Sequence, residues 1–318
     1  PAADGAAETT TTSEQDPAAA GDDDIVVTAQ RRSESAQRVP ISLTALSEET
    51  LVKTNIVSIQ DIGRVAPSFN AFRSAQAANT RLSIRGIGSP GNAAIEPSVG
   101  AFVDGVYIPR PGPLLAGLND VSSVEVLRGP QGTLFGRNAS VGAISIHTAE
   151  PGTQTEGSAS LELGNYGRVR AKGMVNLPVS DTFQTRFSGL YDRFDGYGHD
   201  LLRDERVGNN ETISLRGAMR WEISPSLTWL VRGDYAETKG DGGYNVDFIA
   251  SSVSPTQLDA LRARLGGQLP DTEIGDREAN FSRVGSLRDR QWGISSDLSL
   301  DTGGYTLRLI NSYRDWTS

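Results

Sequence analysis

Alternating apolar and polar residues run through the second half of the chain, after residue 150. In ETISLRGAMRWEI (211–223), Ile213 and Leu215 fall on one face of an extended backbone and Arg216 falls on the other. A period of two predicts a β-strand with one apolar face. The same pattern recurs, more weakly in one glycine-rich pair, so that seven strands are predicted. They cover residues 156–164, 168–179, 182–192, 211–223, 226–236, 291–300 and 305–315.

The connections between these strands differ in length in a regular way. Short turns lie near residues 178–181, 224–226 and 301–304, and they alternate with a small loop at 164–167 and long loops near 195–210 and 238–290. Tight turns that alternate with larger loops are typical of an outer-membrane barrel, where the turns are periplasmic and the loops extracellular. The pattern therefore predicts antiparallel transmembrane β-barrel strands.

Aromatic and basic side chains bear on the choice between a barrel and a soluble sandwich. One apolar face per strand fits a sandwich equally well. Aromatic residues near strand ends suit the interfacial girdles of a barrel; they are Tyr191, Trp221, Tyr235, Trp292, Tyr305 and Tyr313. Arginines on the opposite face favour a wet lumen over a second covered face; they are Arg186, Arg216, Arg220, Arg232 and Arg308.

Residues 40–150 have a mixed pattern of one helix and several short strands. The segment 47–67 predicts a helix that begins after the N-cap Ser47 and stops at Gly63 and Pro67. Its apolar positions are Leu51, Ile56, Ile59 and Ile62. Short strands, each bounded by Gly or Pro, are predicted at 81–86, 99–108, 121–129 and 142–148. We expect a small α+β domain.

The N-terminal part combines an acidic tail with a short β-prone run. Residues 1–23 contain almost no large apolar side chain and are expected to form a disordered tether. The run DIVVTA (24–29) follows, with no hairpin partner nearby in the sequence, and its β-branched residues favour pairing with a sheet edge. Two interpretations are open: a strand that a partner protein takes up, or the first strand of the following domain.

Composition and charge exclude several classes of function. The net charge is −9, but residues 1–24 contribute seven acids and no base, so the remainder carries only −2, which argues against nucleic-acid binding. The chain has no cysteine and two histidines, and no catalytic spacing links them to serine and aspartate. We expect no enzyme, cofactor or metal site; a metal at His199, Asp200 and Asp204 is less favoured than a solvated loop.

Four motifs resemble those of the TonB-dependent outer-membrane receptors. They are DIVVTAQ (24–30), LSIRGIG (82–88), VGAFVDGVYIPR (99–110) and, most specifically, VSSVEVLRGPQGTLFGRNASVGAISIHTAEP (121–151). The resemblance implies a tether at 1–23, a TonB box at 24–30, a plug domain at 31–150 and barrel strands over 151–318. The barrels of this family have about 22 strands, so seven strands predict a piece that holds the plug and the first third of the barrel.

The resemblance also implies roles for individual residues. The segment that binds the TonB-type protein is Asp24, Ile25, Val26, Val27, Thr28 and Ala29. Arg85 and Arg128 would face carboxylates on the inner barrel wall and lock the plug there, with Glu125 orienting Arg128. Substrate would be bound at the plug apices by Arg73, Gln76, Asn79, Asn92 and Arg110.

The function implied by the resemblance is active uptake of a scarce solute, most simply a ferric siderophore, across the bacterial outer membrane. The implied partners are a TonB-type periplasmic energising protein, with its inner-membrane proton-driven complex, and outer-membrane lipid, but no nucleic acid. Haem, cobalamin, carbohydrate or an aromatic compound would fit the same motifs. A passive porin or a surface adhesin would need the barrel but not the box.

Overall fold

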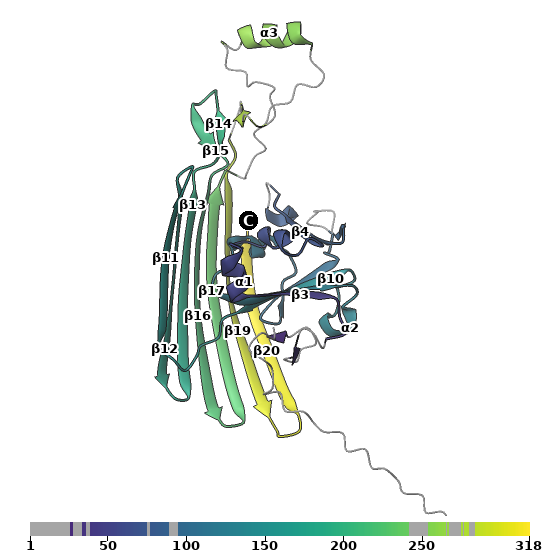
Figure 1. The fold of residues 1–318 in the computed structure, drawn as a ribbon, viewed down its shortest axis with the longest axis vertical. Coiled ribbons are helices and arrows are strands. Elements are labelled where there is room, and N and C mark those ends of the chain that lie inside the picture. Colours follow the sequence, from purple (N-terminus) through teal and green to yellow (C-terminus); the bar gives the residue numbers. More distant parts are fainter. Residues whose placement is uncertain are drawn as a thin grey trace, which may run out of the picture.

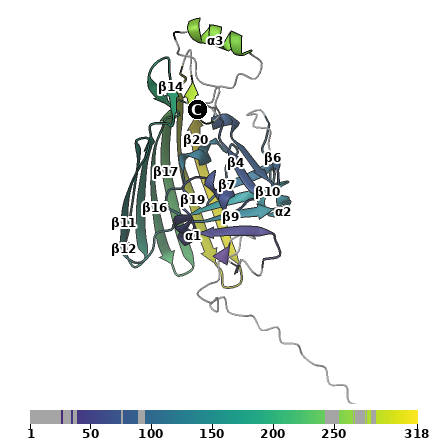
Figure 2. The ribbon, with the colours of Figure 1, turned by 45° about the horizontal axis from the view of Figure 1, so that its top comes forward.

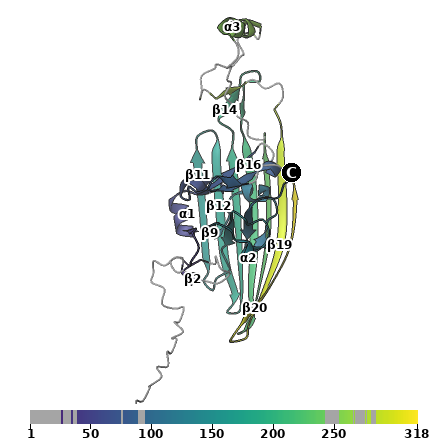
Figure 3. The ribbon, with the colours of Figure 1, turned by 90° about the vertical axis from the view of Figure 1, so that its right-hand side faces the viewer.

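The computed structural model consists of a curved antiparallel sheet and a compact α+β domain on its concave side (Figure 1). The residues that it describes are 26–27, 34–35, 39–74, 77–88, 95–241, 254–264, 266, 275, 277–279 and 284–318. Figures 2 and 3 show from two further directions that the α+β domain lies against the inner face of the sheet. None of the described helices has the length and apolar character that a membrane crossing requires.

The large sheet contains seven strands in the order β11-β12-β13-β16-β17-β19-β20, and every neighbouring pair is antiparallel. Their bounds are Glu156–Gly164, Arg168–Ser180, Phe183–Phe194, Asn210–Ser224, Leu227–Gly240, Leu287–Asp301 and Thr306–Thr317. The seven strands predicted from the sequence are confirmed. Short turns gather at one end of the sheet and long loops at the other (Figure 1), and we call these the short-turn end and the long-loop end.

The two faces of this sheet have the reverse of the polarity found in a soluble protein. Phe187, Leu215 and Ile294 point outward and are more than half exposed, whereas polar groups such as Gln184 and Arg186 are buried on the concave side. A soluble sandwich would bury its apolar face, because burial of apolar surface is the main favourable term in folding. An outward apolar band around a polar interior is instead the pattern of a transmembrane barrel.

The long loops carry structure that the sequence did not predict. Three short strands form a small sheet in the order β15-β14-β18, and a helix lies farther along. Their bounds are Gly198–Asp200 (β14), Glu205–Val207 (β15), Glu278–Ala279 (β18) and Pro255–Arg264 (α3). Val207 and Ala279 are buried against each other, with Val284 packed beside them. This small core joins two loops that are far apart in the sequence.

The α+β domain, which we call the plug, is built on a five-stranded sheet in the order β3-β9-β10-β7-β8. The bounds are Leu43–Ser47, Val121–Arg128, Gly142–Thr148, Val99–Val103 and Val106–Tyr107. A second sheet has the order β4-β5-β6, with bounds Phe69–Phe72, Arg81–Ile84 and Ile87–Gly88. Ile84, Val99, Val124 and Ile144, all fully buried, are part of one shared core. The predicted strands are present, although the one at 99–108 is divided into β7 and β8, and β3, β4 and β6 are additional.

The predicted helix is shorter than its apolar pattern suggested. Helix α1 spans Glu48–Lys53, and its N-cap is Ser47, whose hydroxyl accepts a hydrogen bond from the backbone N–H of Thr50 at 3.3 Å. It ends because Asn55 adopts a left-handed φ of 50°. The later apolar residues are also buried, but they lie in turns and in the 3₁₀ helix η2 (Asp61–Arg64). The periodicity therefore indicated a buried face and not one long helix. Three one-turn elements complete the plug: η3 (Ala77–Asn79), η4 (Gly112–Ala116) and α2 (Gly132–Phe135).

A two-residue ladder precedes the plug. Strand β1 (Val26–Val27) pairs with β2 (Glu34–Ser35) in an antiparallel ladder, so the expectation that the β-prone run lacks a local pairing partner was wrong. The rest of the predicted TonB box and the whole predicted tether at 1–23 lie outside the described residues. The pairing leaves the run available to a partner only when the ladder opens.

Candidate functional site

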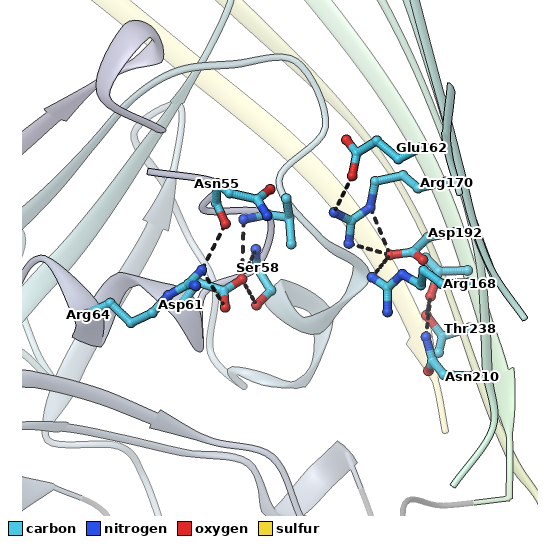
Figure 4. A network of polar contacts seen from close by, with 12 residues as sticks. Asn55, Ser58, Asp61, Arg64, Glu162, Arg168, Arg170, Asp192, Asn210 and Thr238 are labelled. Carbon is cyan, nitrogen blue, oxygen red and sulfur yellow. Dashed lines mark hydrogen bonds and ion pairs between the residues drawn. The ribbon is translucent and has the colours of Figure 1, made fainter. Parts of the chain in front are cut away.

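A cavity of about 340 Å³ lies between the plug and the barrel wall. Strands β12, β13 and β16 line it from the barrel side, near their long-loop ends, and the turn at 57–61 together with Arg73 and η4 lines it from the plug side. Figure 4 shows the polar network on the two sides of this space. We call it the upper cavity.

Three basic side chains from one strand dominate the barrel wall of the upper cavity. Arg168, Arg170 and Lys172 alternate along β12 and therefore share its lumen-facing side. Asp192 stands directly opposite Arg170 in the register of β13. One of its oxygens, Oδ2, accepts hydrogen bonds from Arg168 at 2.8 Å and from Nη2 of Arg170 at 2.8 Å (Figure 4). Glu162 lies 3.6 Å from Arg170, so both guanidinium groups are held in fixed positions.

The plug wall of the upper cavity is a tight turn organised by Asp61. Its Oδ2 accepts hydrogen bonds from the backbone N–H groups of Val57 (3.2 Å) and Ser58 (3.0 Å) and from the Ser58 hydroxyl (2.7 Å). Its Oδ1 lies 2.9 Å from Arg64, which in turn donates to the carbonyl of Asn55 (Figure 4). These bonds fix the backbone that faces β12 across the cavity.

Arg73 reaches the cavity from the plug apex after β4. Its Nη2 donates to Oδ1 of Asn210 on β16 at 3.0 Å, so this side chain bridges plug and barrel. Burial lowers the pKa of Arg73, while the nearby carboxylates of Asp289 and Asp241 act in the opposite direction. The ordinary pKa of an arginine lies so far above neutral pH that Arg73 stays charged.

The upper cavity is suited to an anion. Its charged lining consists of four basic and two acidic side chains, a net formal charge of +2. The bases are Arg73, Arg168, Arg170 and Lys172, and the acids are Asp61 and Asp192. Guanidinium groups bind carboxylate and similar oxygen anions through short, charge-assisted hydrogen bonds.

The structure places the predicted substrate residues apart. Arg73 lines the upper cavity, whereas Asn79 lies in η3 and Arg110 donates to the carbonyl of Ile95 at 3.2 Å; neither of these two lines it. Gln76 and Asn92 lie outside the described residues. Sequence reasoning missed the three bases of β12, although the spacing RVRAK (168–172) is itself a period-two signal.

Acidic plug loops and basic barrel strands hold the plug in place. Asp120, just before β9, forms a bidentate pair with Arg186 of β13 at 2.8 and 2.7 Å, and both side chains are only 8% exposed. Arg232 of β17 lies 2.9 Å from Glu150 and 3.6 Å from Asp104, which follows β7. In these contacts the barrel supplies the cations, the reverse of the polarity expected from the sequence.

The residues predicted to form the lock have other surroundings in the described part of the chain. Arg128 donates to Ser68 at 2.7 Å, to Ser42 at 3.2 Å and to Thr44, all within the plug. Arg85 is exposed in a tight turn with φ 54°, and the Glu125 carboxylate lies 3.6 Å from His147. A lock between these plug arginines and barrel carboxylates stays a prediction.

At the alternative metal site, the side chains of His199, Asp200 and Asp204 are not all turned toward one another. His199 Nε2 lies 3.0 Å from Asp204, but the Asp200 carboxylate is turned toward Arg203 at 2.8 Å. Among the residues that the structure describes, no group of three or more His, Cys, Asp or Glu side chains could hold a metal ion.

Comparisons with known proteins agree with this architecture. Residues 35–143 match the TonB-dependent Receptor Plug Domain. The pesticin receptor of Yersinia pestis is 33% identical over 153 residues, which are 48% of this chain and 22% of the receptor. The catecholate siderophore receptor Fiu of Escherichia coli K12 is 24% identical over 171 residues, 52% of this chain and 21% of the receptor.

The solved structures extend the likeness to the barrel strands. The ferric yersiniabactin uptake receptor FyuA of Yersinia pestis superposes with a TM-score of 0.73 at 21% identity, covering 86% of this chain and 40% of FyuA. A plug domain docked inside antiparallel barrel strands defines a plugged outer-membrane barrel. Residues 35–143 are a plug domain of the TonB-dependent receptor family, and the chain as a whole has the fold of these receptors, which lie in the bacterial outer membrane. It spans about a fifth of the length of the curated relatives and two fifths of FyuA.

Proposed function

We propose that this chain is part of a receptor that binds a ferric siderophore in the upper cavity and imports it into the periplasm. The observation that carries the proposal is the net positive upper cavity between the plug apex and the barrel wall. The relatives, which include a catecholate siderophore receptor and a ferric yersiniabactin uptake receptor, support the same substrate class. In this proposal the long-loop end faces the outside of the cell.

The binding step follows from the charges. Asp192 and Glu162 hold Arg168 and Arg170 in place before ligand arrives, so little side-chain entropy is lost on binding. An anionic chelate that enters from the long-loop end would meet these donors on one side and Arg73 on the other. Arg73 also donates a hydrogen bond to Asn210 of the barrel. A ligand that binds Arg73 would therefore change a contact between plug and barrel.

The import step requires the segment 24–29. A TonB-type protein would add this segment to its own sheet as a strand, and backbone hydrogen bonds would supply the affinity. Since Val26 and Val27 are paired with Ser35 and Glu34, the partner would replace that ladder with its own. Ligand can regulate the exchange only if it favours the state in which the ladder is open.

Deleting residues 24–29 separates binding from import. In the full-length receptor we expect uptake of radiolabelled ferric siderophore to fall to the background of a strain without the receptor, while binding to whole cells is unchanged. The matched control replaces residues 24–29 with a Gly/Ser run of equal length, which keeps the chain length but disfavours strand formation and should fail as the deletion does. Uptake that survives the deletion would favour a passive porin.

Replacing Arg73 with glutamine tests the upper cavity itself. We expect affinity for an anionic ferric siderophore to fall by about tenfold, because one charge-assisted contact is lost. Arg110→Gln is the control, since Arg110 is also a plug-apex arginine but does not line the cavity. Equal loss in both variants, measured by equilibrium binding to the purified receptor, would speak against this cavity as the site.

A further inference from the structure

A second cavity, of about 470 Å³, lies below the upper cavity between the plug and the same barrel wall. We call it the lower cavity; Val57 and Lys172 line both. Strand β12 runs from the long-loop end toward the short-turn end. The positions of its lining residues therefore show which cavity lies nearer each end. Arg168 and Arg170 line only the upper cavity and residues 173–174 only the lower one. Lys172 therefore stands at the boundary.

The charge of the lining changes sign at this boundary. The upper cavity carries a net formal charge of +2. The lower cavity is lined by Glu48, Asp120, Glu162 and a single base, Lys172, a formal charge of −2 that Arg186 partly offsets at Asp120 and Arg170 at Glu162. An anionic ligand that is attracted into the upper cavity would be repelled by the lower one, because charges between protein walls are screened less than charges in open solvent.

Lys172 differs from the other bases of β12 in its partners. Arg168 and Arg170 are both held by Asp192, and Arg170 also approaches Glu162. Within the part of the chain that the structure describes, no carboxylate lies within ion-pair distance of the Lys172 ammonium. Its charge is thus available to a ligand, whereas much of the charge of the two arginines is already compensated.

We infer that Lys172 determines both the depth and the charge selectivity of binding. This inference rests on the proposed function and deepens it. Lys172 supplies the countercharge for the lowest anionic group of the chelate, and the acidic lining below it stops the chelate there in the resting receptor. The substrate class that this arrangement selects is an anionic ferric chelate, in preference to a cationic one.

Two chelates of opposite charge test the inference in the purified full-length receptor. For Lys172→Gln we expect binding of an anionic ferric tris-catecholate to weaken by about tenfold. Binding of a cationic ferric trihydroxamate should stay equal or become tighter, and Lys172→Glu should enlarge both effects. Lys239→Gln is the matched control, because Lys239 is a half-exposed lysine of β17 outside both cavities and should change neither affinity.

The outcomes distinguish this inference from the proposed function. If the unaltered receptor binds the tris-catecholate and Lys172→Gln binds it equally well, the inference is overturned while the proposed function stands. If the unaltered receptor binds neither chelate, the proposed function fails and the inference with it. Lys172→Arg guards against a folding defect: it keeps the charge and should keep the affinity, whereas equal loss in the arginine and glutamine variants would overturn a role for charge.

Discussion

An Asp120→Asn variant is expected to hold its plug less tightly against the barrel wall, by about 3 kcal/mol, because it leaves the buried Arg186 guanidinium without its countercharge. Asparagine suits the position otherwise: it has nearly the same shape and tolerates the left-handed φ of 55° that Asp120 adopts. The measurement is hydrogen exchange of the β9 and β10 backbone amides in the detergent-solubilised full-length receptor, which should become faster.

Two further variants show whether the ion pair is responsible for that effect. The double variant Asp120→Asn with Arg186→Gln removes the uncompensated charge and should recover part of the lost protection. Arg220→Gln breaks a pair with Glu222 whose side chains are 31% and 36% exposed, and it should cost less than about 1 kcal/mol. Unchanged exchange in Asp120→Asn would mean that other contacts hold the plug.

A Gly142→Ala variant is expected to destabilise the plug by about 2 to 3 kcal/mol through overpacking. Gly142 is buried at the start of β10, the central strand of the plug sheet. A Cβ there would lie 2.6 Å from the Ile84 side chain and even closer to the carbonyl oxygen of Leu127, which belongs to the rigid ladder with β9. Neither neighbour can move away without disturbing the shared core.

Gly132→Ala is the matched control for this prediction. Gly132 begins α2, and a Cβ there would meet no atom within 4 Å. Alanine in a helix should therefore be neutral or slightly stabilising. Limited proteolysis of the full-length receptor compares the two variants: we expect faster cleavage within the plug of Gly142→Ala only. Equal resistance in both would contradict the close packing of β10.

The barrel strands could be predicted from the sequence because their two faces meet different surroundings. Each strand meets an apolar medium outside and polar groups inside, so the alternation at residues such as Leu215 and Arg216 persists over the whole strand. The helix after Ser47 was overestimated for the complementary reason. Ile56, Ile59 and Ile62 all face the plug core, but the helix has already ended at Asn55, whose φ is left-handed. The pattern of apolar residues carries no information about φ.

The candidate site was less accessible to sequence reasoning. Arg73, which lines the upper cavity, was named from the sequence because it lies at a predicted plug apex, whereas Lys172 lies on a strand whose alternation is weak and whose bases resemble an ordinary solvated face. The polarity of the plug contacts was also not predictable. Asp120 and Arg186 are 66 residues apart, and only the register of β13 relative to the plug brings them together.

The short ladder between β1 and β2 has a kinetic consequence. Isolated hairpins form within about 1 to 10 μs, and a ladder of two residues per strand is only marginally stable in water. It would therefore open and close many times between collisions with the proposed periplasmic partner. The rate of capture then depends on the fraction of time that Val26 and Val27 are unpaired, and not on how fast they separate. Under the proposed function, a ligand outside the cell would change the import rate in proportion to that fraction, without touching the segment itself.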